Sequence, residues 1–130
     1  MLMKKAVVTD KAPAALGPYS AGVEASQSSK TVYVSGQIPV DPATGNFAGD
    51  DIRTQTAQSL TNIRNILAAA GMDMSDVVKT TVYLSDIADF AAMNEVYATF
   101  FTAPFPARCA VQVAALPKGA KLEIDAVACR

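Results

Sequence analysis

Two apolar runs separated by a turn make up the stretch Pro106-Ala-Arg108-Cys-Ala-Val-Gln-Val-Ala-Ala-Leu116-Pro-Lys-Gly-Ala-Lys-Leu-Glu123-Ile-Asp-Ala-Val127. Its alternating, β-branched pattern predicts two closing strands joined as a hairpin across residues 116–119. Arg108 begins the first of these strands and Glu123 lies inside the second. A charge in such a strand needs an opposite charge, a ligand or water. These two residues are therefore the first candidates for a functional site.

The sequence before this stretch alternates between strand-like and helix-like patterns. Apolar or β-branched runs predict strands over residues 3–8, 30–35 and 77–84. Apolar residues at helical spacing predict a helix from 51 to 70, which Asp50 or Asp51 can cap and Gly71 ends.

A second helix is predicted after Ser85 or Asp86 and before Pro104 and Pro106, which cannot continue it. Its apolar face consists of Ile87, Phe90, Met93, Tyr97 and Phe100. The resulting order predicts an α+β fold in which two helices cover one face of a mixed β-sheet. The other face would expose apolar strands, and such a patch typically marks association with another chain.

Composition limits the classes of function. We expect the 130 residues to form a single domain over 1–130, with 51% hydrophobic residues and no tryptophan or histidine. A net charge of −1 with scattered lysines argues against nucleic acid as a partner. The absence of histidine argues against an ordinary zinc or iron site, so no metal is expected.

The sequence also bears on the cellular location of the protein. No stretch approaches the roughly 20 apolar residues that a membrane helix needs, and the first residues lack the apolar segment of a secretory signal. Cys109 and Cys129 lack the spacing of a redox or metal motif. We therefore expect reduced thiols, a cytoplasmic protein and no membrane partner.

Motifs spread along nearly the whole chain resemble one known family. They are Gly17-Pro18-Tyr19, Val34-Ser35-Gly36-Gln37-Ile38-Pro39, Gln58-Ser59-Leu60, Val78-Lys79-Thr80-Thr81-Val82-Tyr83-Leu84, Met93-Asn94 with Tyr97, Pro106-Ala107-Arg108 and Leu122-Glu123-Ile124. Together they resemble the RidA/YjgF/UK114 family of imine deaminases. The resemblance implies a chorismate-mutase-like fold and a homotrimer with clefts between subunits. It also implies hydrolysis of 2-iminobutanoate and 2-iminopropanoate, released by PLP-dependent dehydratases, to 2-keto acids and ammonia without a cofactor.

The resemblance assigns catalytic roles to the two charged residues. Arg108 would hold the substrate carboxylate, because a guanidinium offers a planar fork of donors that lysine cannot copy. Its alternative is a structural ion pair at the start of a strand. Glu123 would position or activate the attacking water, and its alternative is a solvent-facing glutamate beside Lys121.

Five further residues are implied as substrate-binding. The resemblance gives Tyr19 a ligand-facing role, puts Ser35 in the cleft wall and puts the Gly36 carbonyl near the imine nitrogen. It places Asn94 beside the neighbouring subunit's cleft, although an ordinary exposed asparagine fits the sequence equally well. Ala110 stands where many family members have cysteine, so its backbone would serve the site.

The predicted hairpin gives a geometric expectation for the two charged residues. A turn centred near 117–118 puts position 112 opposite Glu123, with Arg108 on the same side of the hairpin and Cys109 on the opposite side. About four residues of strand then separate Arg108 from Glu123, roughly 13 Å. One small substrate can scarcely bridge this, so we infer that the two residues cooperate across a subunit boundary.

Two other functions remain open at this point. A non-catalytic 2-keto acid-binding or chaperone-like trimer would use Arg108 but would not need Glu123. RNA cleavage or inhibition of translation has been attached to family members, but the chain lacks histidine and a basic patch.

Overall fold

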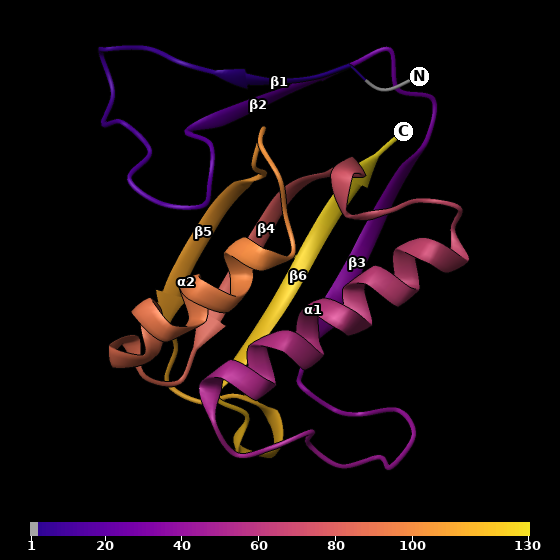
Figure 1. Cartoon of the computed structure of the whole chain (residues 1–130), viewed down its shortest axis with the longest axis vertical. Helices are drawn as coiled ribbons and strands as arrows, with labels where there is room; N and C mark the ends of the chain where they lie inside the picture. The colour runs from indigo at the N-terminus through magenta and orange to yellow at the C-terminus, as the bar shows by residue number, and fades with distance from the viewer. Residues whose placement is uncertain (1–2) are drawn as a thin grey trace.

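Two helices lie against one face of a four-stranded mixed sheet in the computed structural model, which describes residues 3–130 (Figure 1). The elements are β1 (Met3–Val7), β2 (Gly22–Ser26), β3 (Thr31–Gln37), α1 (Ile52–Ala69), β4 (Val77–Leu84), α2 (Phe90–Thr99), β5 (Ala107–Gln112) and β6 (Leu122–Cys129). The expected α+β architecture is confirmed.

The predicted hairpin between the two closing strands is wrong. The strand order is β3-β6-β4-β5, so β4 lies between β5 and β6. The helix α2 connects β4 to β5, which run parallel, whereas β6 pairs antiparallel with both β3 and β4. A strand–helix–strand unit brings its two strands side by side, and β6 pairs with the other edge of β4 rather than with β5.

The helices are capped and buried largely as their sequences indicate. Asp51 begins α1 by accepting a hydrogen bond from the backbone N–H of Thr54 at 3.0 Å, and Gly71 follows the helix end with φ +75°. On the core side of α2, Met93 and Tyr97 are fully buried.

The predicted apolar face of the second helix extends too far toward its N-terminal end. Ile87 is 49% exposed because residues 87–89 form a separate 3₁₀ turn, which Asp86 caps through the N–H of Ala88. Phe90 and Phe100 pack against the core but are only partly buried.

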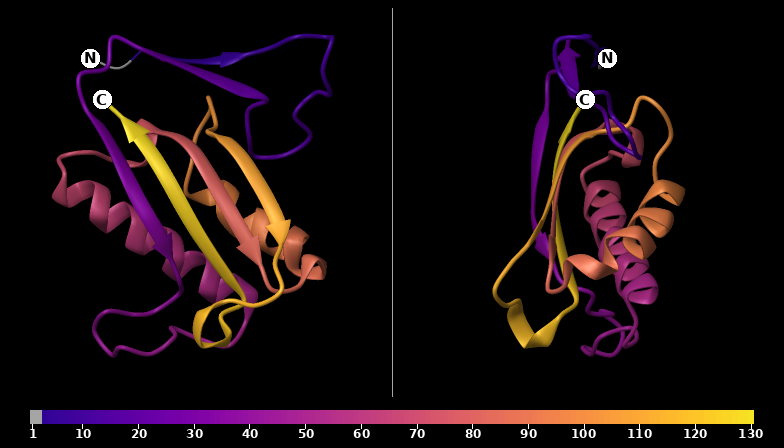
Figure 2. Two further views of the ribbon diagram at one scale, coloured as in Figure 1. Left: turned by 180° about the vertical axis from the view of Figure 1, so that it is seen from behind. Right: turned by 90° about the vertical axis from the view of Figure 1, so that its left-hand side faces the viewer.

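Among residues 3–130, α1 and α2 lie on the same side of the sheet, and neither covers the opposite face (Figure 2). Alternation along β6 directs Leu122, Ile124 and Ala126 into the core beneath the helices, whereas Glu123 and Asp125 point to the uncovered side. We call this side the open face. Tyr33 on β3 and Val111 on β5 are 78% and 45% exposed there, but Thr81, Glu123 and Asp125 lie on the same face, so the predicted apolar patch is only partly present.

The strands β1 and β2 form a separate two-stranded sheet beyond one end of the main sheet (Figure 1). The expected first strand is thus present, while β2 had no sequence prediction. The loop between them returns to the main sheet through a bridge between Ser20 and Ala107. Within residues 3–130, neither helix combines the length and apolar character needed to cross a membrane.

Candidate active site

Arg108 lies at the start of β5 and points toward α2. It pairs in register with Thr80 of β4, whose side chain is fully buried under that helix. The Arg108 Nη1 donates a hydrogen bond of 2.6 Å to the Oδ1 of Asn94 on α2. Arg108 and Asn94 are therefore brought together, and Asn94 is not merely an exposed polar residue.

Aromatic rings surround the rest of the guanidinium. Its Cζ lies 4.8 Å from the ring centre of Tyr97, 5.4 Å from that of Tyr19 and 5.5 Å from that of Phe90. A cation at such distances is attracted by the electron-rich face of a ring. The rings hold the guanidinium without neutralising it.

The charge of Arg108 has no counterion among residues 3–130. The ion pairs found there join Arg53 to Glu95 and Arg130 to Asp76. Burial lowers the pKa of Arg108, while Tyr97 and Tyr19 act in the opposite direction. A half-buried guanidinium that stays charged and keeps free donors is suited to bind an external anion.

Tyr19 reaches Arg108 because its loop is fastened to the start of β5. The Ser20 N–H donates to the Pro106 carbonyl at 3.0 Å, and the Leu16 N–H donates to the Tyr19 hydroxyl at 3.4 Å. We call Tyr19, Asn94, Arg108 and the two rings of Phe90 and Tyr97 the arginine half-site.

Ala110 and Cys109 follow the expected alternation. Ala110 lies two residues beyond Arg108 on the same side of β5 and packs against the core. Cys109 points to the open face, where the Lys79 Nζ lies 3.5 Å from its Sγ. Neither Cys109 nor Cys129 is in a disulfide.

Glu123 lies on the open face, with its carboxylate over Gly36 of β3. A Cβ added at Gly36 would stand 2.0 Å from the Glu123 Oε2 and 2.8 Å from its Cδ. Only glycine therefore admits this carboxylate position. We call Glu123, Gly36 and the adjacent exposed Ser35 the glutamate half-site.

The Glu123 carboxylate makes no hydrogen bond or ion pair within the described part of the chain, not even with Lys121. Asp125, the next acid on the same face, is hydrogen-bonded instead. Asp125 accepts hydrogen bonds from the Tyr83 hydroxyl at 3.1 Å and the Thr81 N–H at 3.2 Å, and the first of these raises the pKa of Tyr83. Among residues 3–130, Glu123 is thus the open-face acid of this strand whose oxygens remain free to accept a hydrogen bond from water.

The two half-sites face opposite sides of one sheet, so the prediction that Arg108 and Glu123 share a side is wrong. Arg108 is level with Thr80 and hence with Ala126 of β6, two strands away. Glu123 lies three residues before Ala126 on β6. Strand spacings of about 4.8 Å across and 3.3 Å along the chain give a Cα separation of roughly 14 Å. Within one chain, a small substrate cannot touch both side chains.

Sequence reasoning missed Phe90 and Tyr97 as site residues because it treated both as core. A signal was present: Phe90, Asn94 and Tyr97 are spaced i, i+4 and i+7, which puts them on one stripe of a helix. Since Asn94 was already a candidate, its helical neighbours were candidates as well.

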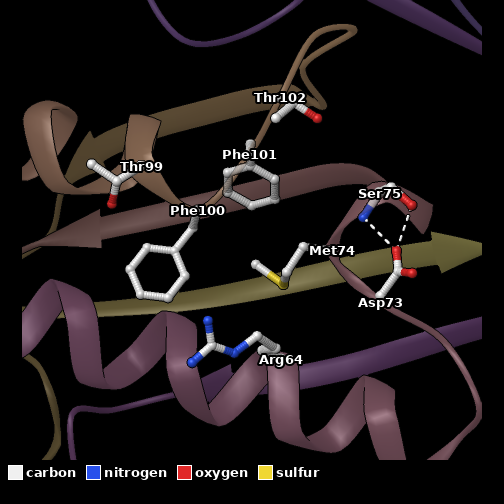
Figure 3. Close-up of a pocket in the computed structure, with 8 residues that line it drawn as sticks. All are labelled: Arg64, Asp73, Met74, Ser75, Thr99, Phe100, Phe101 and Thr102. Carbon is white, nitrogen blue, oxygen red and sulfur yellow. Dashed lines mark hydrogen bonds between the residues drawn. The ribbon is translucent and has the colours of Figure 1, made fainter.

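A surface cavity of about 340 Å³ lies apart from both half-sites (Figure 3). It is lined by Arg64, Asp73, Met74, Ser75, Thr99, Phe100, Phe101 and Thr102, none of which the sequence marked as a candidate site residue. The Arg64 Cζ lies 5.4 Å from the ring centre of Phe100. No group of three potential metal-ligating His, Cys, Asp or Glu side chains gathers anywhere in residues 3–130.

Comparisons with known proteins agree over almost the whole chain. A family model described as Endoribonuclease L-PSP matches residues 9–130. The chain is 50% identical over 127 residues to a Bos taurus protein named 2-iminobutanoate/2-iminopropanoate deaminase, covering 98% of this chain and 90% of that protein. A Salmonella typhimurium protein of the same name is 50% identical over 131 residues, covering 98% and 99%.

Solved structures give the same result for the fold. The crystal structure of the YjgF gene product from E. coli matches with a TM-score of 0.75 and 48% identity, covering 97% of this chain and 98% of that one. E. coli TdcF, solved with bound serine, matches with a TM-score of 0.75 and 47% identity over the same shares.

Proposed function

The chain belongs to the Endoribonuclease L-PSP family, which includes the RidA/YjgF proteins, and from this we propose that it hydrolyses 2-imino acids such as 2-iminobutanoate and 2-iminopropanoate. The products are the 2-keto acid and ammonia. The enzyme is a hydrolase, and water is its only co-substrate.

Arg108 binds the substrate carboxylate in this proposal. Support comes from its lack of a counterion in residues 3–130 and from Asn94, which occupies one amino group and leaves the others free. Asn94 and the rings are neutral, so the positive charge remains available to the carboxylate. Charge-assisted, two-pronged hydrogen bonds then fix the orientation of C2.

Glu123 acts as the general base. It takes a proton from water as the water oxygen forms a bond to C2, and a second proton, supplied by solvent water, adds to the imine nitrogen as its double bond to C2 becomes single. The resulting carbinolamine carries a hydroxyl and an amino group. Glu123 then gives its proton to the amino group, which leaves as ammonia while the hydroxyl proton returns to solvent, so the 2-keto acid forms and Glu123 is again ionised.

The single observation that carries the quaternary part of the proposal is the separation of the half-sites on opposite faces of the sheet. A complete site therefore needs the arginine half-site of one subunit and the glutamate half-site of another. The uncovered face, with its exposed Tyr33, supplies a surface for that association. We propose the homotrimer that the family resemblance implies, because cyclic symmetry then builds identical clefts between neighbours.

Mixing subunits tests this arrangement. Arg108→Ala and Glu123→Ala proteins are each expected to be inactive. After unfolding and refolding of an equal mixture, each cleft draws its arginine and its glutamate from chains chosen at random, so about a quarter of the clefts are intact. Recovery of about a quarter of wild-type activity is expected, and no recovery despite confirmed subunit exchange would refute the shared cleft.

A second candidate function is binding of 2-keto acids without turnover. It is favoured by the arginine half-site, which is complete within one chain whereas the catalytic site is not. The isosteric change Glu123→Gln separates the two functions. The enzyme loses turnover but keeps affinity for 2-oxobutanoate, whereas a pure binder shows no imine hydrolysis before or after the change.

RNA cleavage, suggested by the name of the matching family, has less support. The net charge is −1, and the cation of the candidate site is enclosed by aromatic rings rather than set in a basic patch. Salt-dependent binding of single-stranded RNA would be the measurement that favours it.

A further inference from the structure

A buried pair of hydroxyl groups lies directly beneath the arginine half-site. Thr80 Oγ1 and the Tyr97 hydroxyl are 2.8 Å apart and hydrogen-bonded, and both residues are fully buried. Burying two hydroxyls gains little over burying valine and phenylalanine, which fill similar volumes without a desolvation cost. The pair therefore suggests a role besides packing.

The Tyr97 ring is the closest of the three rings to the guanidinium, at 4.8 Å from Arg108 Cζ. It is also the most firmly held. Phe101 packs against it with ring centres 4.7 Å apart, and the Thr80 bond prevents the ring from sliding along its own plane. Tyr19 and Phe90 are only partly buried, so Tyr97 is the fixed surface on which the guanidinium rests.

The pairing of β4 with β5 is a second connection between the Thr80–Tyr97 pair and Arg108. Thr80 is the residue of β4 directly opposite Arg108 on β5. Thr80 is therefore connected to Arg108 in two ways. Its backbone is paired with that of Arg108 in the sheet, and its hydroxyl holds the Tyr97 ring of α2 that lies against the guanidinium.

We propose that Thr80 and Tyr97 are positioning residues that hold the Arg108 guanidinium in the orientation that receives the substrate carboxylate. The inference rests on the proposed function and adds residues to it. A free arginine side chain loses rotamer entropy when it binds a ligand. A fixed platform removes part of that loss before the ligand arrives. Burial also raises the pKa of Tyr97, so the phenol stays neutral and does not pair with Arg108 as an anion.

Two conservative substitutions test the proposal. Thr80→Val removes the partner of the Tyr97 hydroxyl, and Tyr97→Phe removes that hydroxyl while keeping the ring. Each is expected to weaken 2-oxobutanoate binding about three- to tenfold, the usual effect of one buried hydrogen bond. In imine hydrolysis, KM should rise by the same factor while kcat changes less than about twofold, because carboxylate binding is shared by ground and transition states. Thr80→Ser, which keeps the hydroxyl, should restore wild-type affinity.

Thr56→Val is the matched control. Thr56 is also fully buried, and its hydroxyl bonds to the Ile52 carbonyl at 2.7 Å within α1, away from Arg108. It should lower the melting temperature without changing affinity. Equal weakening by Thr56→Val and Thr80→Val, or unchanged affinity in both Thr80→Val and Tyr97→Phe, would overturn the proposal.

The variant Arg108→Lys distinguishes failure of the positioning role of Thr80 and Tyr97 from failure of the proposed function. If Arg108→Lys abolishes 2-oxobutanoate binding while the Thr80 and Tyr97 variants bind normally, only the positioning role falls. If Arg108→Lys binds 2-oxobutanoate as well as the wild type does, carboxylate capture by Arg108 is wrong, and the positioning role falls with it.

Discussion

Gly36→Ala provides a direct test of where the Glu123 carboxylate lies. The added methyl group would stand 2.0 Å from Oε2, 2.8 Å from Cδ and 3.1 Å from Cγ of Glu123. Carbon and oxygen atoms in ordinary contact are about 3.5 Å apart, so the carboxylate must move by roughly 1.5 Å. The backbone at Gly36 is outside the left-handed region, so the strand itself accepts alanine.

The effects on stability and on catalysis should differ widely. The carboxylate loses no hydrogen bond when it moves, because none was found in residues 3–130, and an off-rotamer side chain costs only about 1 kcal/mol. A displacement of about 1 Å in a catalytic group can slow a reaction about 100-fold. We therefore expect kcat to fall about 100-fold while the free energy of unfolding falls by about 1 kcal/mol or less.

The assay couples a threonine dehydratase to the protein and follows decay of 2-iminobutanoate spectroscopically. Affinity for 2-oxobutanoate and unfolding in urea are measured on the same samples. Gly22→Ala is the matched control, since a methyl group there meets Val7 only at an ordinary 3.4 Å. Wild-type turnover by Gly36→Ala would refute the placement of Glu123 over Gly36.

Three further predictions follow from single contacts. Asn94→Asp puts a carboxylate at the 2.6 Å contact with Arg108, where it forms an ion pair that competes with the substrate carboxylate. Titration should show that 2-oxobutanoate binds at least about tenfold more weakly. Unchanged affinity would contradict the role of Arg108. Ser59→Ala removes a buried hydroxyl that has no hydrogen-bond partner among residues 3–130 and should raise the free energy of unfolding, measured in urea, by about 1 kcal/mol; a loss of stability would show that the hydroxyl is satisfied. Hydrogen bonds from the side chain and then the backbone of Ser75 lower the pKa of Asp73, so its stabilisation is complete above the ordinary value of 3.8 and is lost as pH falls through the lowered pKa. Asp73→Ala should therefore cost about 0.5 kcal/mol at neutral pH, with the difference from wild type vanishing in acid; a difference independent of pH contradicts this.

Local patterns predicted the secondary structure well, but not every pairing of strands. The position of Asp51 before an apolar helical stripe and of Gly71 after it was sufficient for α1, because capping depends on neighbouring residues. The pairing of β5 was missed because the nine residues between β5 and β6 look like a hairpin connection. Nothing local reveals that β4 takes the intervening place, although the β4–α2–β5 order favours it.

The candidate site could be predicted as a set of residues but not as a geometry. Arg108 and Glu123 stand out because charges are rare in apolar strands. Which face each occupies depends on register, and an error in pairing one strand changes that face for the whole strand. Tyr97 shows the other limit: one side of a buried ring can belong to the core while the other side faces a ligand-binding cation.

The residues that bind the substrate carboxylate and those that activate water come from different segments of the chain, which has an evolutionary consequence. Thr80, Asn94, Tyr97 and Arg108 all come from the continuous β4–α2–β5 segment, residues 77–112, whereas Gly36 and Glu123 come from β3 and β6. After gene duplication, drift confined to β3 and β6 can erase chemistry while leaving ligand capture intact. Such a copy would become a receptor for keto acids without any change of architecture.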